Sequence, residues 1–141
     1  MPSSPPATAT ERLALARVGR LATVTAAGRP HVVPVCFAIV AGRVYSAVDG
    51  KPKSTRALQR LENVAATGRA SLLADHYEED WSRLWWVRVD GTARVLEHGP
   101  EFEAALAGLV EKYDQYQDNR PAGPVIALIP ERWRSWIPFE T

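Results

Sequence analysis

The chain of 141 residues has one cysteine, three lysines and no run of about 18 apolar residues. Because Cys36 is alone, no disulfide can form within the chain, and zinc sites built on several cysteines are excluded. The start lacks the basic end and apolar stretch of a signal peptide. We therefore expect a cytoplasmic protein without a membrane partner, in which Cys36 is a small buried hydrophobe.

Common catalytic and nucleotide-binding motifs are also absent. The nine glycines never occur two positions apart, which excludes the G-x-G turn of dinucleotide-binding folds, and no glycine precedes Lys53-Ser54 as it would in a P-loop. There is no G-x-S-x-G nucleophile elbow. His31, His76 and His98 are far apart without clustered carboxylates, so we expect no metal site.

Charge is almost balanced, with 17 basic and 16 acidic residues and a formal net charge of +1. Strong non-specific binding to nucleic acid is therefore not expected. Two of the three lysines, Lys51 and Lys53, precede a helix expected to start at Ser54. The free N–H groups of a helix start, two ammonium groups and nearby hydroxyls would form a phosphate cradle. A solvated basic loop with an ordinary serine cap is the alternative, and the residues alone leave both open.

Length and a hydrophobic content of 46% predict one domain with an ordinary core. Residues 1–9, rich in proline and small residues, are expected to be a disordered leader, and residues 10–141 the folded domain. Hydrophobic periodicity and turn residues predict strands over residues 21–25, 31–40, 43–47, 69–76, 84–96, 124–130 and 132–137, and helices over residues 8–18, 54–63 and 100–113.

Two residues constrain these strands. Pro34 has no N–H for a ladder, so its strand must be bulged, lie at an edge or face something other than a neighbouring strand there. Gly91 in the middle of a strand indicates a bulge or bend. No strand–helix–strand repeat is visible. Six or seven strands with short turns favour a mainly β fold, in which an antiparallel sheet closes into a barrel with peripheral helices.

The segment after residue 76 is acidic and aromatic. Glu78-Glu79-Asp80 could supply acid or base carboxylates, although a solvated loop face is the better interpretation. Trp81, Trp85 and Trp86 lie close together, and neighbouring residues of a strand point to opposite faces. Of the adjacent pair Trp85 and Trp86, one would then be exposed in a single chain and available to a dimer interface or a planar ligand. Packing in the core is the alternative.

Several segments, in this order, resemble the pyridoxamine 5′-phosphate oxidase-like split-barrel superfamily: Arg20-Leu21-Ala22-Thr23-Val24, Gly28-Arg29-Pro30-His31-Val32-Val33-Pro34-Val35, Val44-Tyr45-Ser46-Ala47, Lys51-Pro52-Lys53 and Asn63-Val64-Ala65. More narrowly, Asp75 to Arg88 resembles the actinobacterial branch that uses the deazaflavin coenzyme F420. The resemblance extends from Glu11 to Trp136.

This resemblance implies a six-stranded antiparallel split β-barrel that forms a homodimer, with two cofactor sites between the subunits. It places the following residues at the cofactor: Val33, Pro34, Val35 and Cys36 along the ring, Tyr45, Ser46 and Ala47 beside the ring or the ribityl chain, Lys51, Lys53 and Ser54 at the phosphate, and Trp86 or its neighbour Trp85, less securely Trp133, from the partner subunit.

The function implied is an F420-dependent oxidoreductase that transfers a hydride to a small unsaturated or carbonyl acceptor. An FMN-dependent enzyme of the same fold is the alternative, and a non-catalytic binder of flavin, haem or tetrapyrrole is the third. The C-terminal part lacks the Arg-x-His pattern of true pyridoxamine-phosphate oxidases, which argues against vitamin B6 oxidation. We assign no catalytic side chain, since the cofactor carries the chemistry; Tyr45, Tyr77 and His76 are proton donors by type only.

Overall fold

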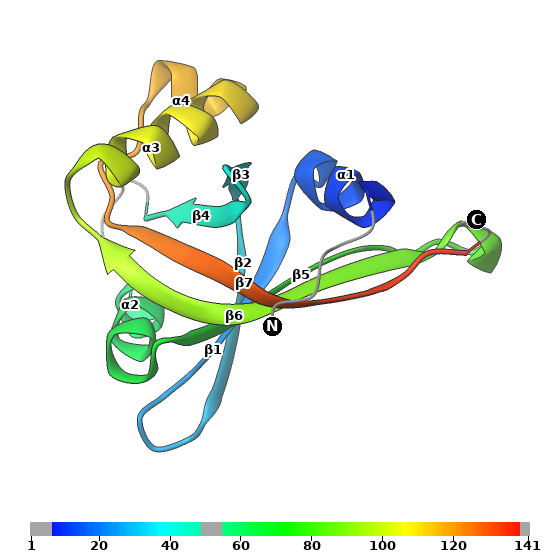
Figure 1. The fold of residues 1–141 in the computed structure, drawn as a ribbon, viewed down its shortest axis with the longest axis horizontal. Coiled ribbons are helices and arrows are strands. Elements are labelled where there is room, and N and C mark those ends of the chain that lie inside the picture. The colour runs from blue at the N-terminus through cyan, green and yellow to red at the C-terminus, as the bar shows by residue number, and fades with distance from the viewer. Residues whose placement is uncertain (1–6, 49–54, 139–141) are drawn as a thin grey trace.

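The computed structural model describes residues 7–48 and 55–138, which form one curled antiparallel sheet with helices around it (Figure 1). The strands are β1 (Gly19–Val24), β2 (Pro30–Val35), β3 (Ala38–Val40), β4 (Arg43–Ala47), β5 (Arg69–His76), β6 (Trp85–Leu96) and β7 (Val125–Trp136). The helices are α1 (Ala7–Leu15), α2 (Thr55–Thr67), α3 (Pro100–Lys112) and α4 (Asp114–Asp118), with a 3₁₀ turn over Trp81–Arg83. The sheet order is β2-β1-β5-β6-β7-β4-β3.

Several elements agree with the sequence patterns. β4 and β5 have the expected bounds, and α3 starts at Pro100 with Glu101 and Glu103 in its first turn. The bulge expected at Gly91 is confirmed by a shift of the β6–β7 register between Asp90 and Gly91. A Cβ at position 91 would lie 2.0 Å from the carbonyl oxygen of Ile129, so only glycine lets the two backbones approach this closely.

The two ends of the folded chain differ from the expected ranges. α1 starts at Ala7 and buries Ala9 fully, so residues 7–9 of the expected leader belong to a helix; residues 1–6 lie outside the described residues. At the other end, the two expected short strands form the single strand β7, because its ladder with β6 continues on both sides of the register shift.

The main correction concerns residues 31–40, which were expected to form one strand. The run divides at Cys36 and Phe37: β2 pairs with β1, β3 pairs with β4, and the two halves form opposite edges of the sheet. The sheet therefore has seven strands and is not closed, so the prediction of a closed six-stranded barrel is wrong in both respects. The edge position expected for Pro34 is confirmed, and its side chain is exposed.

The core has two parts on opposite faces of the sheet. Inside the curl, Leu13 of α1 and Val64 of α2 belong to a cluster with alternate residues of the long strands, including Leu72, Val87 and Val89. Outside β4 and β7, α3 covers a second cluster that includes Tyr45, Leu106, Leu109, Val125 and Ala127. Except for Leu96, which packs against the second cluster, the outward-facing residues of β1, β5 and β6 contribute to neither cluster and are half-buried or exposed.

The end of α3 supports the break between β2 and β3. The backbone N–H of Phe37 donates to Tyr113 Oη at 3.1 Å, and this oxygen lies 3.0 Å from the Phe37 carbonyl oxygen and 3.1 Å from that of Arg17. Lys112 Nζ donates to the Phe37 carbonyl at 2.9 Å and lies 3.9 Å from the centre of the Phe37 ring. Burial lowers the pKa of Lys112 to about 8 and raises the pKa of Tyr113. We call Cys36, Phe37, Lys112 and Tyr113 the corner.

Replacing Tyr113 by phenylalanine tests the corner. The substitution leaves the buried N–H of Phe37 without its acceptor, so we expect the free energy of unfolding to fall by about 1–3 kcal/mol in urea titrations. Tyr77→Phe is the control, because Tyr77 is 66% exposed and should change stability by less than about 0.5 kcal/mol. Equal stability of the two variants would contradict the role assigned to Tyr113.

Candidate functional site

The cofactor residues expected on two separate segments meet at the open edge of the sheet. The β3–β4 ladder starts at the pair Ala38–Tyr45, so Ser46 and Ala47 extend past the end of β3 while still pairing with β7. The two-residue link after Val35 brings the end of β2 to this place. We call this region, made of residues 33–37 of the edge and 46–47 of β4, the open seam.

Side chains alternate along the β2 part of the seam. Val33 and Val35 pack toward the inner core, whereas Pro34 is exposed on the other side of the strand. Cys36 is half-buried against the second cluster below α3. The four residues expected along a ring therefore present a valine face and a proline face rather than one common surface.

Ser46 is the polar group of the seam. Its side chain is 5% exposed, and its Oγ has no hydrogen-bond partner in the described part of the chain. Buried hydroxyls nearly always have a partner, because an unpaired one costs about 1–3 kcal/mol. Among the described residues of β2 and β4, one other buried polar side-chain atom lacks a hydrogen-bond partner, Nδ1 of His31 at the start of β2. A polar ligand at the seam would satisfy the hydroxyl, so this position fits the expected cofactor.

The phosphate cradle expected at Lys51, Lys53 and Ser54 lies outside the described residues. In the sequence these residues join the last described residue after β4, Val48, to the first residue of α2, Thr55.

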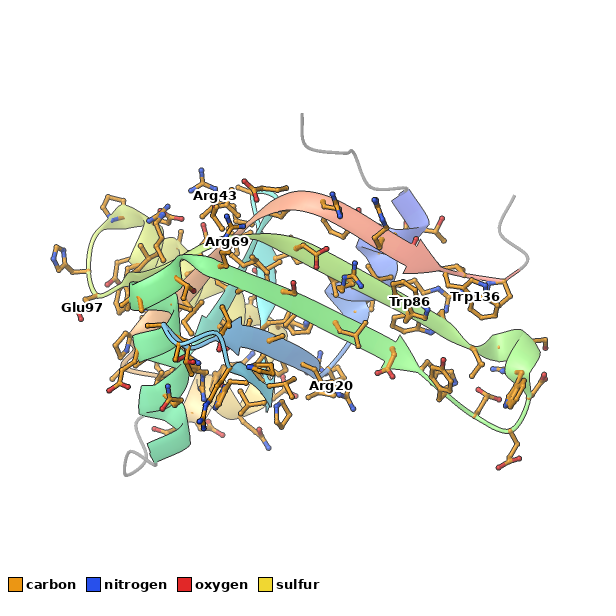
Figure 2. The ribbon with its side chains drawn as sticks, turned by 90° about the horizontal axis from the view of Figure 1, so that it is seen from below. Arg20, Arg43, Arg69, Trp86, Glu97 and Trp136 are labelled. Atoms are coloured by element: carbon orange, nitrogen blue, oxygen red, sulfur yellow. The ribbon has the colours of Figure 1, made fainter. Side chains whose placement is uncertain are left out.

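Trp86 is placed away from the seam. It lies on β6, which β1 and β5 separate from β2, and β7 separates from β4. Its side chain points to the outer face, opposite Trp136 in the β6–β7 register, and Figure 2 shows the two indoles side by side. A cavity of about 340 Å³ adjoins it, lined by Leu73, Asp75, Tyr77, Trp86 and Arg88. One copy of the chain does not bring Trp86 to the other expected residues.

The second tryptophan of this face was not expected. Trp133, which the resemblance suggested, lies opposite Val89 and packs toward the inner core. Trp136 is three residues further, points outward and is 47% exposed. Because side chains alternate along a strand, Trp133 and Trp136 point to opposite faces. We expected this strand to start only at residue 132, and without its pairing partner the face that points to the core was not determined.

Comparison with known proteins identifies the fold family. Residues 6–137 match the family model described as pyridoxamine 5′-phosphate oxidase. The chain belongs to this family. No curated protein sequence matches it.

Solved structures of this fold extend over the same range. A conserved hypothetical protein from Mycobacterium tuberculosis has 21% identity and a TM-score of 0.74, with 96% of this chain and 86% of that one covered. A haem binding protein from Mycobacterium smegmatis has 23% identity and a TM-score of 0.72, covering 99% of this chain and 57% of that one. A FAD-binding protein from Mesorhizobium loti has 23% identity and a TM-score of 0.68, with 94% of both chains covered.

In this member of the pyridoxamine 5′-phosphate oxidase family, Tyr45 serves the second core cluster. Its ring is buried below α3, and its hydroxyl donates to Glu101 Oε2 at 2.7 Å. Burial, followed by the Glu101 bond, raises the pKa of Tyr45 to about 12. A phenol this weakly acidic, already donating to a carboxylate, is a poor proton donor at neutral pH.

Glu101 joins three elements at the start of α3, namely α3 itself, β4 and β6. Besides Tyr45, it accepts hydrogen bonds from Arg43 at 3.0 Å and Arg94 at 2.5 Å. The Tyr45 hydrogen bond, followed by the one from Arg94, lowers the pKa of Glu101 to about 2. The Glu101 cluster thus holds β4 on the side opposite the seam, and its carboxylate is not free to act at the seam.

The acidic loop has local partners. Asp80 caps the 3₁₀ turn by accepting from the backbone N–H and hydroxyl of Ser82, and Glu78 contacts His76 and Arg83. These contacts favour the solvated loop over an acid–base pair. No group of three metal-ligating side chains occurs in the described part of the chain, and no described helix has the length and apolar character needed to cross a membrane.

In the Glu101→Gln variant, the free energy of unfolding should fall less steeply as the pH is lowered. A carboxyl with pKa of about 2 when folded and near its ordinary value of 4.5 when unfolded stabilises the fold above pH 4.5, and this contribution is lost as the pH falls toward 2. Urea titrations between pH 5 and 2 should therefore show a smaller loss in the variant. Glu103→Gln is the matched control from the same turn, whose carboxylate is 65% exposed and binds only Arg120 among described residues. An unaltered slope in Glu101→Gln would contradict the cluster.

Proposed function

We propose that this chain is a cytoplasmic, homodimeric oxidoreductase whose folded domain, with α1 as its first element, holds a flavin-type cofactor along the open seam. Coenzyme F420 is the expected cofactor and FMN the alternative. The observation that carries the proposal is the unpartnered Ser46 Oγ, buried where two strands of the family's fold leave the sheet open. Membership of the pyridoxamine 5′-phosphate oxidase family supports a flavin-type group at this place.

Each part of the seam has a role in this proposal. Ser46 Oγ donates to, or accepts from, a polar group of the cofactor, and the valine side of β2 packs beside the ring. Lys51, Lys53 and Ser54 hold the phosphate, which would be drawn to two ammonium groups near the start of α2. The Ala47 side chain is buried in the second cluster below α3, on the face of β4 opposite Ser46, so only the backbone of Ala47 could lie beside a planar ring.

When bound, a reduced deazaflavin or flavin supplies a hydride to an unsaturated or carbonyl acceptor. The residues of this chain bind the ring, anchor the phosphate and shield the seam from water. Neither Tyr45 nor Glu101 offers an acid for the reaction, because both are bound to each other in the α3 cluster. The acceptor proton would then come from solvent or from the second copy.

The homodimer is part of the proposal, because a single chain leaves Trp86 on its outer face, away from the seam. A second copy that packs on this face could bring its Trp86 to the cofactor of the first. On this face Leu73 and Trp86 are apolar and half-buried, and charged residues of β5 and β6 surround them, which is the composition of a mixed interface.

A non-catalytic binder is the second candidate. Solved structures of the same fold include a haem binding protein and a FAD-binding protein, so one architecture accommodates both kinds of ligand. Among the described histidines, His31 lies on β2 but at its start, outside the seam, and its Nδ1 is buried. Tight cofactor binding without oxidation of reduced F420 by any of a panel of acceptors would favour this candidate.

The cofactor is identified by titrating the purified protein with F420 and with FMN and following fluorescence quenching. We expect saturable F420 binding at micromolar concentration, and Lys53→Ala should weaken it by about 1.5–3 kcal/mol through loss of a charge-assisted contact. Arg29→Ala, which removes an exposed cation in the β1–β2 turn, is the control. If FMN binds and F420 does not, the cofactor is the flavin and not the deazaflavin. If neither binds, the proposal is overturned.

Ser46→Ala separates stability from binding. The substitution removes an unpaired buried hydroxyl, so the free energy of unfolding of the cofactor-free protein should stay the same or rise, while cofactor binding should weaken. Ser135→Ala, at an exposed position of β7, should change neither. A loss of stability with unchanged binding would show that Ser46 serves the fold alone.

A further inference from the structure

A small cavity adjoins the corner, on the side of α1 and α4. Its volume is about 380 Å³, and it is lined by Arg17, Cys36, Tyr113, Asp114 and Gln115. Three segments far apart in sequence meet there: the link from α1 to β1, the link from β2 to β3, and the junction of α3 with α4. The volume lies at the lower end of the range of small-molecule pockets.

Two cations meet beside this cavity without a carboxylate between them. Arg17 donates to the Lys112 carbonyl at 3.0 Å, and its guanidinium lies 4.7 Å from the centre of the Tyr113 ring. The Lys112 ammonium lies 5.2 Å from the same ring. Neither cation has an ion-pair partner among the described residues. Burial, followed by repulsion from Arg17, lowers the pKa of Lys112 to about 8. An anion at this place would offset the repulsion.

The rest of the lining limits the charge and the character of such an anion. Asp114 also lines the cavity, but it forms no ion pair with Arg17 in the described part of the chain. Two cations and one carboxylate leave a single positive charge, which a monoanion neutralises. The Tyr113 ring and the Cys36 thiol supply apolar surface, and the Gln115 amide can donate or accept hydrogen bonds.

We infer that this cavity binds a small organic monoanion, a carboxylate with a short apolar body, whose charged group lies between Arg17 and Lys112. A carboxylate matches the geometry of a guanidinium, and Arg17 has N–H groups without a partner among the described residues. The site is separate from the seam hydroxyl, because Cys36 packs against the outer cluster, whereas Ser46 lies on the opposite face of β4. A phosphate of the cofactor is the other source of an anion here, and the test separates the two.

Cys36 gives a direct probe of the cavity, because it is the only thiol of the chain. Iodoacetate and iodoacetamide have nearly the same shape and alkylate a thiol in the same way: the sulfur displaces iodide, a carbon–sulfur bond forms, and the thiol proton passes to solvent. The ratio of the two rates on one thiol therefore cancels the reactivity of the thiol and reports the preference of the cavity for a carboxylate.

We expect the ratio of the iodoacetate rate to the iodoacetamide rate to be at least about tenfold higher on the folded, cofactor-free chain than on the same chain in concentrated urea. Hydrogen bonds to a charged group exceed those to a neutral one by about that factor. Equal ratios in the two states, or a folded chain in which Cys36 reacts with neither reagent, would overturn the inference.

Variants locate the charged group. Arg17→Gln should lower the iodoacetate rate about tenfold and leave the iodoacetamide rate unchanged, and the latter shows that the surroundings of the thiol are intact. Asp114→Asn should raise the iodoacetate rate, because it removes a carboxylate from the lining. Arg29→Gln, with the same change of charge at an exposed turn, is the matched control and should change neither rate. An unaltered iodoacetate rate in Arg17→Gln contradicts the site.

Reversible binding is measured by protection of Cys36 from the neutral reagent. Butanoate should slow alkylation by iodoacetamide in a saturable way, and butanamide, which has nearly the same shape without the charge, should need about tenfold higher concentrations for equal protection. Equal protection by the two compounds, or protection by neither, would show that the cavity does not select a carboxylate and would overturn the inference.

Saturating F420 or FMN distinguishes the two sources of the anion. If the chain with bound cofactor still prefers iodoacetate, the carboxylate site is separate from the cofactor site. If the cofactor abolishes the preference and binds about tenfold more weakly to Arg17→Gln, the cavity holds the phosphate of the cofactor, and the inference is overturned. If neither cofactor binds but the preference for iodoacetate persists, the proposed function fails and the carboxylate site stands.

Discussion

The shape of the sheet depends on a link of two residues. β2 and β3 lie at opposite edges of a seven-stranded sheet, yet only Cys36 and Phe37 separate them in sequence. The edges must therefore come together at one point, which forces the sheet to curl. The hydroxyl of Tyr113 and the ammonium of Lys112 satisfy the backbone of Phe37 there. Both belong to the end of α3, so the helix that covers the outer cluster also fixes the curl.

The curl explains why the polar group of the seam lies where it does. Beyond Tyr45, β4 continues without β3 while β7 still pairs with it, and Ser46 turns its hydroxyl toward the inside. A closed barrel would have placed a strand at this edge. The open edge is compatible with a ligand only because α3 and the Glu101 cluster hold the other side of β4. The contacts on the outer face of β4 thus hold the strand in place where its inner edge has no neighbouring strand.

Local patterns predicted much of this fold. The turns before β4 and β5 predicted where these strands begin, and the position of Gly91 predicted the bulge, because both effects are decided within one or two strands. The break at Cys36 could not be predicted, since an apolar run of ten residues reads as one strand until its pairing partners are known. Tyr45 shows the same limit: its strand was correct, but the face that it occupies depends on α3, which lies 55 residues further along the chain. Trp136 was missed for a related reason, because the register with β6 decides which tryptophan points outward.

The exposed Pro34 has a consequence for how copies of this chain can meet. A free sheet edge is a template for further strands, and this sheet has two. On β2 the proline removes one donor from the edge, and on the other side β3 offers only three residues. Edge-to-edge extension, the route to fibres and runaway sheets, is thereby disfavoured at both ends. Any contact between copies is thereby directed to the broad faces of the sheet rather than to its edges.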